Sequence, residues 1–73
     1  MIKIGTWYKY NYLNELASEF MNKYYSPFKI VEIKGNICIC KTNKSDFNWE
    51  WNKKFINENC HEITDIQAFE ESL

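Results

Sequence analysis

The sequence has no arginine, a single histidine, a single proline and only two glycines among its 73 residues. With 45% apolar residues as well, this composition excludes a low-complexity disordered chain, which cannot bury enough apolar surface to fold. A chain of this length has room for one domain, and folding hides only ~60% of its surface. We therefore expect one globular domain over residues 1–64. We expect the acidic segment 65–73 either to dock as a short helix or to fray.

Long apolar runs are also missing. No stretch approaches the ~18 apolar residues that a membrane span needs, and the N-terminal residues do not have the apolar segment of a secretion signal. The three cysteines are an odd number and do not form the disulfide framework of small secreted domains. We therefore expect a soluble cytoplasmic protein with reduced thiols and no membrane partner.

The net charge of −1 gives the chain no general attraction to polyanions. Residues 1–45 carry seven lysines and three glutamates, whereas residues 46–73 carry seven acidic residues and two lysines. This distribution predicts one positive and one negative side. The absence of arginine weighs against nucleic-acid binding, because the arginine side chain both stacks on bases and makes bidentate hydrogen bonds to phosphates.

The first half of the chain predicts a strand followed by a helix. Residues 2–10 begin with apolar and charged residues in alternation, which indicates a first strand bent at Gly5. Asn11 is a suitable N-cap for a helix, and Ser26-Pro27 ends it. The apolar side of this helix is defined by residues three and four apart: Leu13, Leu16, Ala17, Phe20, Met21 and Tyr24.

The second half predicts a meander and a short closing strand. Residues 28–33 and 37–40 form a hairpin around Gly35-Asn36, with Phe28, Ile30 and Glu32 on one side. Residues 47–51 alternate as a third strand, with Phe47, Trp49 and Trp51 on one side. We expect a turn or a single 3₁₀ turn over residues 53–60, and a closing strand over residues 61–64.

This order of elements resembles SH3-like small barrels. The residues that carry the likeness are Ile4-Gly5, the hairpin over 28–36, and Trp49 to Phe55 before the closing segment. The resemblance implies a small barrel whose first loop is replaced by a helix. The acidic stretch and proline pocket of signalling SH3 domains are absent, so it does not imply recognition of proline-rich peptides. A helix on one face of a curled antiparallel sheet explains the same pattern. The predicted fold is α+β, with four or five antiparallel strands and one amphipathic helix after the first strand.

The cysteines raise the question of a metal site. Cys38 and Cys40 lie two apart on a predicted strand, so their thiols face the same side, and Cys60-His61 follows later. These four residues form the donor set of a tetrahedral zinc site, which is the alternative interpretation. The spacing differs from that of zinc knuckles, and cysteines alternating with isoleucines are typical of small buried side chains in a central strand. We therefore predict no metal and no other cofactor.

The sequence also shows no set of residues with the spacing of a known kind of catalytic site. Cys60 and His61 are neighbours on a predicted strand, so they point to opposite faces and are poorly placed as a thiolate–imidazolium pair. Gly5 and Gly35 are too far apart for a phosphate-binding loop. We predict that the chain is not an enzyme.

Aromatic residues are in excess. They make up 18% of the chain, more than a thin core encloses when each buries ~150–250 Å². Exposed tyrosine and tryptophan side chains anchor protein interfaces or stack on nucleic-acid bases. We predict a partner-binding surface made of Tyr8, Tyr10, Tyr12 and Trp51, because each stands beside polar residues or beside an aromatic residue assigned to the core.

Small size and A/T-rich residue usage resemble the accessory proteins of bacteriophages. This resemblance implies a non-enzymatic protein that binds a host protein in the bacterial cytoplasm and inhibits or redirects it, as host-takeover and anti-defence proteins do. The alternative function is a nucleic-acid-binding small barrel that uses lysines and aromatic stacking. A third hypothesis is self-association through an edge strand or through the Trp49–Trp51 face.

Overall fold

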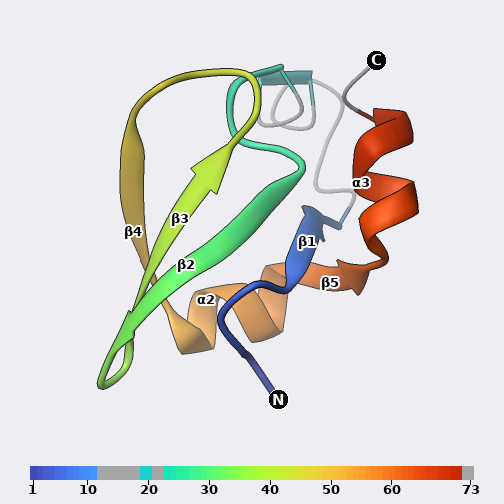
Figure 1. Cartoon of the computed structure of the whole chain (residues 1–73). Coiled ribbons are helices and arrows are strands. Elements are labelled where there is room, and N and C mark those ends of the chain that lie inside the picture. Colours follow the sequence, from blue (N-terminus) through green and yellow to red (C-terminus); the bar gives the residue numbers. More distant parts are fainter. Residues whose placement is uncertain (12–18, 21–22, 72–73) are drawn as a thin grey trace.

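A five-stranded antiparallel sheet forms the centre of the computed structural model, which describes residues 1–11, 19–20 and 23–71 (Figure 1). The order of strands across the sheet is β4-β3-β2-β1-β5. The predicted α+β class and strand number are confirmed. The described elements are β1 (Trp7–Tyr10), β2 (Phe28–Lys34), β3 (Ile37–Thr42), β4 (Asn48–Asn52), α2 (Lys53–Asn59), β5 (Cys60–Ile63) and α3 (Asp65–Glu71).

The β2–β3 hairpin forms where the sequence predicted it. Lys34 pairs with Ile37 across a two-residue loop, and Gly35 has φ 61° at the position where type II′ turns place glycine. A β-bulge at Val31 shifts the register between Ile30 and Glu32. The prediction that Glu32 shares a side with Phe28 is therefore wrong, because the extra residue reverses the alternation and brings Ile33 opposite Cys38.

One face of the sheet, which we call the inner face, carries most of the core. Phe28 and Ile30 of β2 and Cys38 and Cys40 of β3 are fully buried there, because alternate residues of a strand point to the same side. Ile56 of α2 packs into the same cluster. The partly buried side chains around it are Tyr25, Ile33, Trp49, Trp51 and Phe55. The core is thus one cluster between the sheet and α2.

The expectation of a turn over residues 53–60 is wrong, because α2 is a seven-residue α-helix. Asn52 caps it, its side-chain oxygen accepting a hydrogen bond from the Phe55 N–H at 2.7 Å. Ile56 is the only buried residue of α2. The segment therefore lacks the apolar residues three and four apart from which a helix is predicted. The helix ends at Cys60, whose extended backbone begins β5.

The acidic segment forms α3, which lies beside β1 and β5 (Figure 1). Two reciprocal hydrogen bonds form a capping box at its start: the Thr64 N–H donates to Gln67 Oε1 and the Gln67 N–H donates to Thr64 Oγ1. Ala68 is buried on its inward side. Lys9 Nζ of β1 lies 2.7 Å from Glu71 Oε1 and ties the last turn to the sheet.

The first strand and the first helix differ from expectation. β1 begins only at Trp7, because residues 3–6 form a turn in which Gly5 has φ 89°. Most of the helix predicted between Asn11 and Pro27 lies outside the described residues, although Glu19, Phe20, Lys23 and Tyr24 are helical. The helices that the structure describes in full follow β4 and β5 rather than β1.

The sheet is open, with β4 and β5 at its two edges, so the SH3-like barrel is not confirmed. Among the described residues, no helix has the length and apolarity to cross a membrane.

The cap of α2 gives a test of the local structure. Replacing Asn52→Ala removes the acceptor for the Phe55 N–H, and we expect the free energy of unfolding to fall by about 1 kcal/mol in urea denaturation. Asn48→Ala is the matched control, because Asn48 is an exposed residue of the same strand without a capping role, and its effect should stay within about 0.5 kcal/mol. Equal effects of the two substitutions would contradict the assigned cap.

Candidate binding surface

Two of the residues predicted to bind a partner belong to the core. Tyr8 and Tyr10 are buried on the inner face, where their rings lie 5.9 and 5.2 Å from that of Phe28. The expectation that they are exposed is wrong because β1 is an interior strand, between β2 and β5. Burial raises the pKa of both hydroxyls, and Glu62 adds to the rise at Tyr8.

Trp51 is half-buried and has partners within the chain. Its Nε1–H donates a hydrogen bond to Tyr10 Oη at 2.7 Å, and its ring stacks on Phe55 at a centroid distance of 4.3 Å. The indole thus joins β4 to β1 and α2. Tyr12 lies outside the described residues. The structure therefore does not bring Tyr8, Tyr10 and Trp51 together on an exposed surface.

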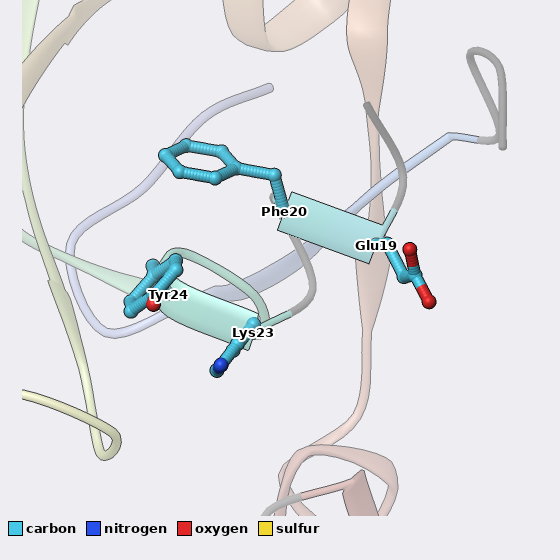
Figure 2. Close-up of a pocket in the computed structure, with 4 residues that line it drawn as sticks. All are labelled: Glu19, Phe20, Lys23 and Tyr24. Atoms are coloured by element: carbon cyan, nitrogen blue, oxygen red, sulfur yellow. The ribbon is translucent and has the colours of Figure 1, made fainter. Parts of the chain in front are cut away.

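A different set of aromatic side chains is exposed. Phe20, Tyr24 and Phe47 have 52, 43 and 47% of their surface accessible to solvent. We call these three residues the aromatic surface. The rings of Phe20 and Tyr24 are 5.1 Å apart and point to the same side of their segment, above a surface hollow that Glu19 and Lys23 also line (Figure 2).

The aromatic surface is supported from below by the core. The ring of Tyr25 lies 5.8 Å from Phe20, 6.0 Å from Phe47 and 5.0 Å from Trp49. Trp49 in turn contacts Phe28 at 5.9 Å. Continuous ring packing therefore links the exposed rings to the centre of the inner face, and packed rings lose little freedom when a partner binds.

Two buried polar groups near the aromatic surface have no hydrogen-bond partner among the described residues. They are the Nε1–H of Trp49, whose ring contacts Phe47, and the hydroxyl of Ser45, in the loop that leads to Phe47. A buried donor without an acceptor costs ~1–3 kcal/mol.

Sequence reasoning did not single out these three rings as a binding surface. Phe20 and Tyr24 follow the apolar period of the predicted helix, and Phe47 alternates with Trp49 and Trp51. The Tyr24-Tyr25 pair is the one available signal. Neighbouring aromatics point in different directions, and here Tyr25 turns to the core whereas Tyr24 is exposed.

No family model, curated protein or solved structure matches this chain.

The residues of the alternative zinc site are separated by the sheet. Cys38, Cys40 and Cys60 are free thiols buried on the inner side, whereas His61 is exposed with its Nδ1 2.7 Å from Asn11 Oδ1. Cys60 and His61 thus face opposite sides, as their neighbouring positions predicted. Within the described ranges, no three histidine, cysteine or acidic side chains are gathered closely enough to hold a metal ion.

Burial sets the chemistry of the thiols. It raises the pKa of Cys40 and of Cys60 from 9.0 to about 12, and it also raises that of Cys38. Proximity to Cys38 adds to the rise at Cys40. Thiolate is the reactive form of cysteine, so these groups are poor nucleophiles in the folded chain.

The thiols predict a pH dependence of stability. The unfolded chain loses these protons near pH 9, whereas the folded chain keeps them to about pH 12. Since the folded state then binds more protons, the free energy of unfolding should fall as the pH rises from 9 towards 12. Urea denaturation across this range measures the fall.

Thiol labelling checks the same account. Ellman's reagent at pH 8 should react slowly with the native chain and rapidly with all three cysteines in urea. Rapid labelling of a native thiol would contradict the burial of that residue.

Proposed function

We propose that this chain is a non-enzymatic domain that binds another protein through the aromatic surface of Phe20, Tyr24 and Phe47. The observation that carries the proposal is that three rings, each about half exposed, stand on a packed aromatic support. Rigid aromatic side chains are the commonest anchors of protein interfaces.

The charges around the aromatic surface favour a protein partner over a polyanion. Glu19 and Lys23 carry opposite signs beside the rings of Phe20 and Tyr24. Lys23 Nζ lies 5.4 Å from the centroid of the Tyr24 ring, which satisfies part of its charge within the chain. A rim of balanced charge exerts little attraction on phosphates but accommodates the mixed polar rim of a protein interface.

The proposed partner is a host protein in the bacterial cytoplasm, which the chain inhibits or redirects. This part of the proposal rests on the resemblance of size and residue usage to bacteriophage accessory proteins. We also propose that the fold is an opened relative of the SH3-like small barrels. Two features support this relationship: β5 lies beside β1, and α2 occupies the place of the 3₁₀ turn between the fourth and fifth strands.

Capture from bacterial cytosol tests the protein-binding proposal. The tagged chain should retain one partner at near-stoichiometric yield after nuclease treatment, and the double substitution Tyr24→Ala, Phe47→Ala should abolish the capture. Ile4→Ala is the matched control, because Ile4 is an exposed apolar side chain outside the aromatic surface. Unchanged capture by the double variant, or a partner lost on nuclease treatment, would contradict the proposal.

A specific feature of the opposite face of the sheet, which we call the outer face, favours nucleic-acid binding as a second candidate function. Lys29 and Lys41 stand directly opposite each other on β2 and β3. Lys29 Nζ lies 5.4 Å from the centroid of the Trp7 ring. Like charges in cross-strand positions repel, and a bound phosphate would relieve the repulsion while Trp7 stacks on a base.

Fluorescence anisotropy with a labelled single-stranded oligonucleotide distinguishes the two candidates. The second candidate predicts binding that weakens with salt, and the salt slope should fall by about 1.4 when Lys29→Ser and Lys41→Ser remove two phosphate contacts. Lys54→Ser is the control, because Lys54 lies 3.9 Å from Glu58 on α2, away from the outer face. The protein-binding proposal predicts no measurable binding to the oligonucleotide.

A further inference from the structure

Helix α3 turns its apolar side chains away from the protein. Ile66 and Phe69 have 72 and 66% of their surface exposed, whereas Ala68 on the inward side is 1% exposed. Residues three apart are neighbours on a helix surface. Ile66 and Phe69 therefore form one apolar strip on a helix whose opposite side packs against the sheet.

The helix that carries this strip is held firmly in place. The capping box of Thr64 and Gln67 fixes its first turn, and the Ala68 N–H donates to the Thr64 carbonyl at 2.9 Å. The bond between Lys9 and Glu71 fixes its last turn to β1. Because the helix is already ordered, binding of a partner does not include the entropic cost of ordering it. The strip is therefore suited to recognition.

Two carboxylates stand beside the strip. Glu70 follows Ile66 by four residues and Asp65 precedes Phe69 by four, which places both exposed residues on the same side of the helix as the strip. Glu71 is neutralised by Lys9. Carboxylates therefore border the strip, and lysine or arginine side chains on the partner would complement their charge.

We propose that α3 is a second docking element, which inserts Ile66 and Phe69 into an apolar groove with a basic rim on another protein. Presentation of an amphipathic helix to a groove is a common mode of recognition. A second copy of this chain does not fit the surface, because a two-fold contact through α3 would place Asp65 and Glu70 against the same carboxylates.

This inference goes beyond the proposed function, because the strip shares no residue with the aromatic surface. Ile66 and Phe69 belong to α3, which packs beside β1 and β5 (Figure 1), whereas Phe47 precedes β4. A second binding surface on another element suits the redirection of a host protein better than simple occlusion.

Site-specific photo-crosslinking in bacterial cytosol tests the inference. The full chain carrying p-benzoylphenylalanine in place of Phe69 should crosslink to another protein, and Ile66→Ser should remove that crosslink. The same probe in place of Glu58, an exposed residue of α2, is the control. The crosslink should persist when Tyr24→Ala and Phe47→Ala disable the aromatic surface, so failure of the proposed function and failure of this inference are distinguishable.

The affinity of the chain for the purified crosslinked protein measures how much the strip contributes to binding. Ile66→Ser with Phe69→Ser should weaken binding at least about 30-fold, the effect of losing a hot-spot side chain. Asp65→Lys with Glu70→Lys should slow association about 10-fold and reverse its salt dependence. All four of these side chains are exposed, so both double substitutions should leave the midpoint of thermal unfolding nearly unchanged. A crosslink between two copies, the absence of any crosslink at position 69, or equal affinity of the variants would overturn the inference.

Discussion

The packing of Phe28 against the rings of Tyr8, Tyr10 and Trp49 is the interaction on which the rest of the structure depends. It connects β1, β2 and β4 at one fully buried point. Truncating a buried phenylalanine to alanine costs ~3–5 kcal/mol. The whole stability of a 73-residue domain is only ~4–11 kcal/mol at 0.05–0.15 kcal/mol per residue. A core this thin depends on few contacts, and the stacking of Trp51 on Phe55 extends the same cluster to α2.

This core also decides which side chains remain for function. The inner face is filled by rings that contact one another. Other large apolar side chains of the described residues are exposed, among them Phe20, Tyr24 and Phe47 and, on α3, Ile66 and Phe69. The thiols are enclosed with the rings, and burial keeps them protonated and unreactive. These exposed apolar side chains are the surface features on which the proposed contacts with a partner rest.

The sequence predicted the features that depend on neighbouring residues. Gly35 marked the hairpin turn, alternation placed β4 with Asn48 and Glu50 exposed, and the opposite directions of Cys60 and His61 followed from their adjacency. Features that depend on distant residues were not predictable. Tyr8 and Tyr10 are buried because β5, fifty or more residues away in the sequence, pairs with β1. Helix α2 forms because its cap and a single buried isoleucine suffice once the sheet is present. The bulge at Val31 gave no local signal and changed the face of every later residue of β2.

Hydroxyl-radical footprinting of the native chain, read by mass spectrometry, tests the central claim that the aromatic excess divides into a buried cluster and an exposed surface. The tyrosines provide an internal comparison, because Tyr24 is exposed whereas Tyr8 and Tyr10 are buried. The account predicts rapid oxidation of Phe20, Tyr24, Phe47 and Phe69, with Tyr8, Tyr10 and Phe28 protected until the chain is unfolded in urea. Oxidation of Tyr8 and Tyr10 in the native chain as fast as that of Tyr24 would contradict it.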